Sequence, residues 1–124
     1  LKDKPVLITE NGIAVNDDRY RIVYIAAMLQ SLKEAMEMGA DVIGYSHWTL
    51  LDNWEWGTYN PTFGLASVDK ETFARTLKTS GRFYGNIAEN NGYDQTILKK
   101  YLNLYRIKYN SHEYHSKIRH DSSV

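Results

Sequence analysis

Pro5-Val6-Leu7-Ile8-Thr9-Glu10-Asn11-Gly12 opens the stretch that decides the fold, residues 5–48 of the 124-residue chain. Its first five residues form an apolar run that does not alternate, which is typical of a strand buried on both faces in a parallel sheet. A second run of this kind, Asp41-Val42-Ile43-Gly44-Tyr45-Ser46-His47-Trp48, closes the stretch. Two such strands joined by a helix make a βαβ unit, so we predict an α/β fold with parallel strands.

The segment between the two predicted strands has the pattern of an amphipathic helix. From about Arg19 to Met38, apolar residues recur with a period near 3.6, and Gly39 supplies a natural end. Asp17 or Asp18 can cap the first turn. The apolar positions are Ile22, Val23, Ile25, Ala26, Leu29, Leu32 and Met36. We expect this face of the helix to pack inside the protein.

Weaker patterns follow the second predicted strand. Residues 63–69 are expected to be extended and to turn at Lys70-Glu71. A helix is predicted from near Thr79 or Ser80 to Asn90, and Asp94 is the expected cap of a further short helix. From about residue 107 the chain is a polar tail.

Composition excludes several classes of protein. Lys plus Arg and Asp plus Glu both number 15, which gives no electrostatic argument for nucleic acid or an anionic membrane as a partner. No apolar run approaches the ~18 residues of a membrane span. The chain has no cysteine, so disulfide and thiolate chemistry are excluded, and we expect a cytoplasmic protein. Without a glycine-rich phosphate loop, no nucleotide cofactor is expected.

No metal site is predicted. His112 and His115 lie three residues apart in the tail, whereas the helix of a zinc protease needs histidines four apart so that both face the metal. Ser116 stands where that motif requires the second histidine. We therefore expect the tail histidines to be solvated.

All three tryptophans lie in one stretch of nine residues, Trp48-Thr49-Leu50-Leu51-Asp52-Asn53-Trp54-Glu55-Trp56. Composition alone favours a packed core, because indole rings are costly to leave in water. The interleaved Asp52, Asn53 and Glu55 favour a ligand platform instead, since buried charge is expensive unless it is paired. A flat apolar face beside hydrogen-bonding groups suits a sugar, whose C–H face stacks while its hydroxyls are bound.

Two polar clusters, Glu10-Asn11 and the tryptophan stretch, lie at the carboxyl ends of the predicted strands. Ligands bind at that edge in parallel α/β architectures. For Glu10, this pattern leaves a helix-cap partner, a structural ion pair and a catalytic group as alternatives. Glu55 either forms a salt bridge with a distant arginine or holds a polar ligand in a dry site. His47 is interpreted as a hydrogen-bonded spacer rather than a base.

Together the clusters resemble a known family. Ile8-Thr9-Glu10-Asn11-Gly12, then the tryptophan stretch, then Phe63-Gly64-Leu65 are similar in order and spacing to family 1 glycoside hydrolases. These are retaining β-glycosidases, among them β-glucosidases and β-galactosidases. The resemblance covers about residues 4–91, and residues 87–92 with the helix after them resemble the archaeal members.

The resemblance implies a (β/α)8 TIM barrel, which takes about 250 residues. Residues 1–124 would be the C-terminal part of this single domain and would supply its last two βα units, strands seven and eight. Glu10 would be the catalytic nucleophile. Trp48 would form the floor under the non-reducing sugar, and Glu55 would bind the outer hydroxyls of that sugar. Trp56 would donate its indole N–H to a neighbouring hydroxyl, and Phe63 would lie near the C6 side.

The implied reaction is hydrolysis of unphosphorylated β-glucosides, β-galactosides or related oligosaccharides by double displacement. The family's acid/base glutamate lies in an Asn-Glu-Pro motif that this sequence lacks, so the N-terminal rest of the barrel is an expected partner. The alternatives are a carbohydrate-binding or structural fragment without hydrolysis, and a 6-phospho-β-glycosidase. No cofactor, metal, nucleic acid or membrane is expected, and a homo-oligomer stays open.

Overall fold

The computed structural model describes residues 4–109 of the chain. The polar tail that the sequence predicts from about residue 107 lies outside these residues from position 110 on, together with His112 and His115. Residues 107–109 belong to the last helix, α3 (Gln95–Tyr109).

The predicted βαβ unit is confirmed. Strands β1 (Val6–Asn11) and β2 (Val42–His47) pair in parallel, and helix α1 (Asp18–Glu37) connects them. The caps read from the sequence form at both ends of α1. The Asp17 carboxylate accepts a hydrogen bond from the Arg19 N–H at 3.0 Å. Gly39, at a φ of +96° that suits glycine, donates its N–H to the Met36 carbonyl.

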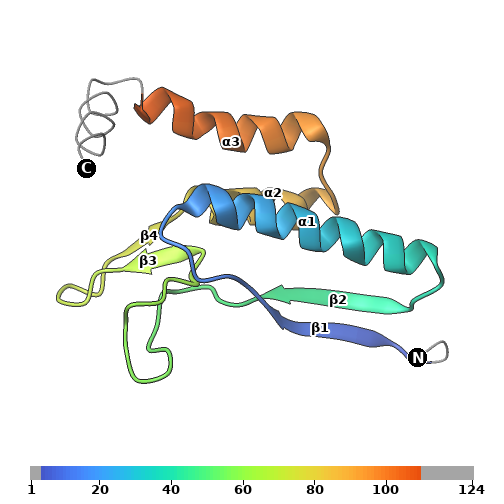
Figure 1. Cartoon of the computed structure of the whole chain (residues 1–124), viewed down its shortest axis with the longest axis horizontal. Coiled ribbons are helices and arrows are strands. Elements are labelled where there is room, and N and C mark those ends of the chain that lie inside the picture. The colour runs from blue at the N-terminus through green and yellow to red at the C-terminus, as the bar shows by residue number, and fades with distance from the viewer. Residues whose placement is uncertain (1–3, 110–124) are drawn as a thin grey trace, which may run out of the picture.

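The prediction that both strands are buried on two faces is wrong for the described residues. Leu7 is 52% exposed and Ile43 is 64% exposed, whereas Val6 and Val42 on the other face are half-buried. Figure 1 shows the reason, because α1 and α2 (Thr79–Asn90) lie on one side of the strand pair only. The apolar run has a covered face and an open face.

The core lies between the helices. Ile22, Ile25 and Ala26 follow one another at helical spacing along α1 and pack with Leu65 and Phe83. Tyr93 and Tyr101 place their rings against Phe83, with centroids 5.4 and 5.5 Å away. The expected apolar positions Val23 and Met36 are wrong as core residues, because both are half exposed. Val23 lies off this stripe, whereas Met36 lies on it and lines an open hollow near the end of α1.

A small antiparallel hairpin, β3 (Ala66–Val68) with β4 (Arg75–Leu77), follows the tryptophan stretch. The extended segment and its turn at residues 70–71 were predicted, and α2 has the expected bounds. Asp94 caps α3 by accepting the Ile97 N–H at 2.8 Å, although α3 is longer than the short helix expected.

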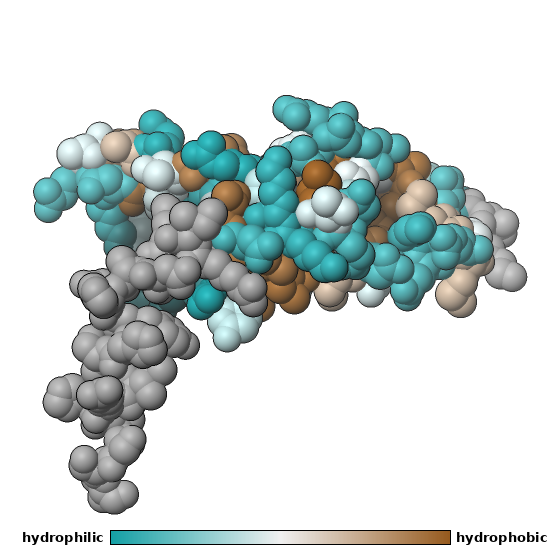
Figure 2. All heavy atoms as spheres, turned by 90° about the horizontal axis from the view of Figure 1, so that it is seen from above, coloured by the Kyte–Doolittle hydropathy of each residue, from teal (hydrophilic) through white to brown (hydrophobic). Residues whose placement is uncertain are grey.

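The helix-bearing face is mainly hydrophilic, with apolar residues showing only in patches between the charged and polar ones (Figure 2). Among the helices of residues 4–109, none has both the length and the apolar character needed to cross a bilayer.

Candidate functional site

Glu10 lies in a bulge near the end of β1. Ile8 pairs with Tyr45 and Asn11 pairs with His47, so β1 uses three steps where β2 uses two. Thr9 and Glu10 accommodate the extra residue, and both side chains are exposed. Bulges next to active sites re-aim side chains, so this geometry sets the direction of the Glu10 carboxylate. The sequence predicts that Glu10 ends the strand, and β1 extends one residue further, to Asn11.

The structure brings the two predicted clusters together at the carboxyl ends of β1 and β2. The Trp48 N–H donates to the Asn11 carbonyl at 2.9 Å. A Cβ atom on Gly12 would lie 1.8 Å from the Trp48 carbonyl oxygen, so only glycine fits there. In addition, the Tyr45 hydroxyl donates to Asn11 Oδ1 at 2.8 Å. Asn11 and Gly12, the two residues after Glu10, are therefore held against the end of β2 and the start of the tryptophan stretch.

Trp48 and Glu55 form a side-chain pair within the tryptophan stretch. The indole Nε1–H of Trp48 donates to Glu55 Oε1 at 2.8 Å, and the Glu55 side chain is almost buried. Main-chain bonds between Glu55 and Thr58, at 2.8 and 3.1 Å, close the turn behind it. Among the described residues, Glu55 Oε2 takes no hydrogen bond. Within the described residues, the partner of Glu55 is therefore an indole and not the arginine of the salt-bridge alternative.

The other two tryptophans do not lie in a core within the described residues. Trp56 is 97% exposed, and Trp54 is more than half exposed with its ring edge-on to Tyr59 at 4.8 Å. They stand on the loop between β2 and β3, which projects from the body of the molecule (Figure 1). The packed-core explanation of the tryptophan stretch is thus wrong for these two indoles.

The main-chain carbonyl of Phe63 contacts the end of β2. Its carbonyl oxygen lies 3.4 Å from His47 Nε2, and the Thr49 N–H donates to the same oxygen at 3.4 Å. Burial lowers the pKa of His47, and the bond to Phe63 opposes that shift only in part. The ring is therefore neutral near pH 7. Its contact with the Phe63 carbonyl agrees with the interpretation of His47 as a hydrogen-bonded spacer.

Asp52 has a structural role in the tryptophan stretch. Its carboxylate accepts the Gly64 N–H at 2.7 Å and forms an ion pair with Lys78 Nζ at 2.8 Å. The Asp52 N–H donates to the Ala66 carbonyl at 3.0 Å. These bonds fix the loop that carries Trp48 and Glu55 to the hairpin and to the start of α2.

Arg21 is a residue that the sequence analysis missed. It is 1% exposed and forms an ion pair with Asp18, while its guanidinium also donates to the carbonyls of Val15 and Thr62. Asp18 in turn accepts the N–H and the hydroxyl of Ser80 at 2.8 and 2.6 Å. The network joins both loops around the site to α1 and α2. An arginine next to the apolar stripe, three residues after an aspartate, was the available signal.

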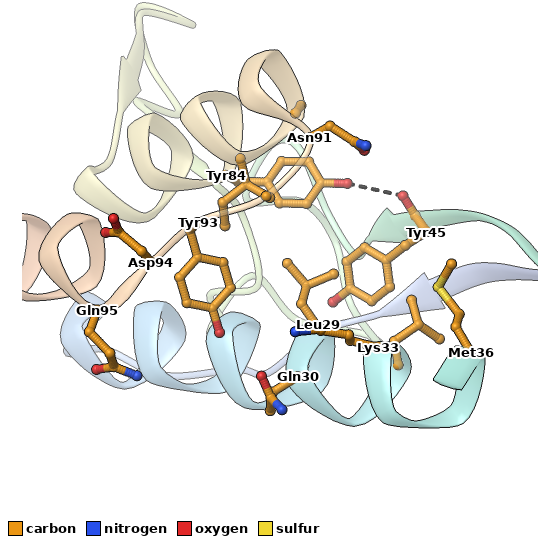
Figure 3. A pocket seen from close by; sticks show the side chains of 14 residues that line it. Leu29, Gln30, Lys33, Met36, Tyr45, Tyr84, Asn91, Tyr93, Asp94 and Gln95 are labelled. Carbon is orange, nitrogen blue, oxygen red and sulfur yellow. Dashed lines mark hydrogen bonds between the residues drawn. The ribbon is translucent and has the colours of Figure 1, made fainter. Parts of the chain in front are cut away.

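A hollow of about 710 Å³ lies away from Glu10, between α1, β2 and α2 (Figure 3). Its tyrosine hydroxyls all donate within the protein, Tyr84 to the Tyr45 carbonyl at 3.1 Å and Tyr93 to the Ala26 carbonyl at 2.7 Å. Within residues 4–109, no group of three or more His, Asp or Glu side chains is placed to hold a metal ion.

Comparison with known proteins identifies close similarity to one family. The sequence model of glycosyl hydrolase family 1 matches residues 1–93. The 1,4-beta-D-glucan glucohydrolase of Thermotoga neapolitana and beta-glucosidase A of Thermotoga maritima are each 40% identical over 97 residues, which is 70% of this chain and 22% of those proteins. The chain spans between 14% and 22% of the length of the curated relatives it matches.

Solved structures agree with the sequence comparison. A beta-glycosidase from Pyrococcus horikoshii is 43% identical with a TM-score of 0.75, covering 79% of this chain and 23% of that one. A family 1 beta-glucosidase from Thermotoga maritima is 39% identical with a TM-score of 0.71, covering 73% of this chain and 23% of that one. The two-stranded βαβ unit with its following hairpin and helix is therefore similar to part of each of these larger proteins.

Proposed function

Because the chain belongs to glycosyl hydrolase family 1, whose solved β-glucosidases are TIM barrels, we propose that it is the C-terminal part of a retaining β-glycosidase. In this proposal β1 and β2 are barrel strands seven and eight, and Glu10 is the catalytic nucleophile. The observation that carries the proposal is the contact between the two polar clusters. The residue after Glu10, Asn11, accepts a hydrogen bond from the Trp48 main chain, and the Trp48 indole donates one to the buried Glu55 carboxylate.

The reaction proceeds by double displacement. The Glu10 carboxylate attacks the anomeric carbon, the bond from that carbon to the aglycone oxygen breaks, and a glycosyl ester forms. The departing oxygen takes a proton from a carboxylic acid about 5–5.5 Å from Glu10, contributed by another part of the barrel. The same group then removes a proton from water, which attacks the anomeric carbon, frees Glu10 and leaves the sugar in its original configuration.

The sugar subsite is built on the Trp48–Glu55 pair. Their hydrogen bond fixes the plane of the indole, so its face is a preset floor for the C–H face of a sugar. Glu55 Oε2 is the acceptor left for sugar hydroxyls, and its burial strengthens such bonds because water does not compete there. Trp56 has an exposed indole N–H to donate to a neighbouring hydroxyl, and Phe63 borders the C6 side.

The proposed substrates are unphosphorylated β-glucosides and β-galactosides. A phosphate on C6 would lie near the Glu55 carboxylate. Two negative charges repel one another strongly at short range where burial limits screening by water. Turnover of p-nitrophenyl β-glucoside and of its 6-phosphate separates this proposal from a 6-phospho-β-glycosidase. Preference for the phosphorylated sugar would overturn the substrate assignment.

The rest of the barrel is the proposed partner. The open face of the strand pair exposes Leu7 and Ile43, and parallel sheets are normally covered on both faces. Apolar hollows of about 440 and 370 Å³ flank the unit, one beside β1 and the end of α1, the other beside the end of β2. Neighbouring βα units of a barrel would fill both. We use the term completed barrel for a protein that combines the full chain with the N-terminal βα units of a family member.

The test of catalysis is the Glu10→Gln variant of the completed barrel. Loss of the nucleophile should remove nearly all turnover, whereas Glu89→Gln, at an exposed position on α2, should leave it unchanged. Proton NMR of the first product formed should show the β-anomer. Near-normal rates for Glu10→Gln would overturn the assignment. Quenching of tryptophan fluorescence by glucose or gluconolactone without any turnover would instead favour a carbohydrate-binding fragment.

A further inference from the structure

Asn11, the residue after Glu10, is anchored to β2 by both its main chain and its side chain. Its carbonyl accepts the Trp48 N–H at 2.9 Å, and its Oδ1 accepts the Tyr45 hydroxyl at 2.8 Å. Gly12 follows in contact with the Trp48 carbonyl. On the other side of Glu10, Ile8 is the next residue of β1 in register with β2. The bulge is therefore fixed at both of its ends.

We propose that Tyr45 is a positioning residue for the glycosidase reaction, holding the Thr9–Glu10 bulge through Asn11 so that the Glu10 carboxylate is aimed at the sugar. This inference rests on the proposed function. A bulge leaves its extra residue outside the hydrogen-bonded ladder, so the direction of Glu10 depends on the anchors beside it. Of these anchors, the phenol–amide bond is the one made between side chains.

The location of Tyr45 is consistent with a residue that positions another side chain rather than one that contacts the substrate. Its ring lines the hollow between α1 and α2, on the face of the strand pair that carries the helices (Figure 3). Tyr84 donates to the Tyr45 carbonyl at 3.1 Å, which ties this point of β2 to α2. Burial raises the pKa of Tyr45 to about 12, with smaller contributions from Tyr84 and Tyr24. The phenol therefore stays protonated and able to donate at any working pH.

Tyr45→Phe removes the hydroxyl and keeps the ring. A displacement of a catalytic group by about 1 Å can cost ~100-fold in rate, and a single lost anchor should permit part of that. We expect kcat of the completed barrel, and the rate at which a 2-deoxy-2-fluoro glycoside labels Glu10, to fall about tenfold. The KM for p-nitrophenyl β-glucoside should change little, because Tyr45 does not touch the sugar.

Tyr93→Phe is the matched control. Tyr93 lines the same hollow and also donates its hydroxyl to a carbonyl, that of Ala26 at 2.7 Å, but it has no link to Asn11. Its loss should lower Tm by a similar amount and leave the labelling rate unchanged. In the Asn11→Ala variant, adding Tyr45→Phe should have almost no further effect on the rate, because the two residues act through one bond.

The outcomes are separable. Slower labelling in Tyr45→Phe, normal labelling in Tyr93→Phe and no added effect in the double variant would support the positioning role. Normal labelling in Tyr45→Phe, or equal slowing in both tyrosine variants, would overturn it while leaving the proposed function intact. No labelling of Glu10 in the parent protein would overturn both. If Tyr45→Phe did not fold, Asn11→Ala alone must show the same loss of kcat at unchanged KM, and a normal kcat there would refute the role.

Discussion

Replacing Arg21 by methionine should destabilise the protein more than any exposed substitution on α1. Methionine keeps most of the length and apolar volume of the side chain and removes the charge. It breaks the ion pair between the Arg21 guanidinium and the Asp18 carboxylate, which is 12% exposed. The carbonyls of Val15 and Thr62 lose a donor as well.

The magnitude follows from what remains around Asp18. Removing one partner of a buried ion pair costs about 3–5 kcal/mol. Asp18 keeps two hydrogen bonds from Ser80, and the Thr62 hydroxyl still donates to the Val15 carbonyl at 2.7 Å. We therefore expect the lower end of that range, a loss of ~3 kcal/mol in the free energy of unfolding.

Arg19→Met is the matched control, since Arg19 pairs with Asp17 on the same turn but the two side chains are 49% and 32% exposed. Exposed pairs contribute about 0.2–1 kcal/mol. Urea titrations of the full chain at pH 7, followed by tryptophan fluorescence and far-UV circular dichroism, measure both variants. The combination Asp18→Asn with Arg21→Met should be less destabilised than Arg21→Met alone, because both charges of the broken ion pair are then removed. A loss below ~1 kcal/mol for Arg21→Met, or an equal loss for Arg19→Met, would refute the reasoning.

Two further predictions use the same titration. Gly12→Ala should lower the free energy of unfolding by at least ~2 kcal/mol, because its Cβ would lie 1.8 Å from the Trp48 carbonyl oxygen. Gly85→Ala, in α2 with open space around it, should raise the free energy of unfolding by about 0.5–1 kcal/mol. Equal effects at the two glycines would contradict the packing described. His47 has its pKa lowered by burial, so the unfolded chain binds the proton more readily, and stability should be complete above the usual histidine pKa of about 6.5 and fall as pH drops below it. The loss between pH 7 and pH 5 should be smaller in His47→Gln than in the parent, and identical losses would show that His47 does not contribute.

Local signals in the sequence predict the elements of this fold well. The bounds of α1 come within a residue of the prediction because Asp17 and Gly39 act on their immediate neighbours. The register between β1 and β2, in contrast, is not predicted by local signals. It depends on pairs such as Tyr45 with Asn11, which are far apart in the chain, and no single-sequence pattern indicates the bulge at Glu10.

The candidate site divides in the same way. A pattern of residue types was sufficient to single out Glu10, Trp48 and Glu55, and the resemblance to a family supplied a role for each. The partner of Glu55 was not predictable, because an indole and a guanidinium both satisfy a carboxylate and the sequence does not say which lies nearer. Arg21 was missed because a charged residue beside an apolar stripe usually points to solvent.

The most direct test of the central claim, that Glu10 is the nucleophile of a retaining β-glycosidase, is mass spectrometry of the completed barrel after incubation with a 2-deoxy-2-fluoro β-glucoside that has a good leaving group. Fluorine slows both steps, and the leaving group restores the first, so the glycosyl ester accumulates. We predict a mass increase of one fluoroglucosyl group, carried by the peptide that contains Glu10 and absent in Glu10→Gln. Turnover of substrate with no label on that peptide, or with the label on another carboxylate, would contradict the account.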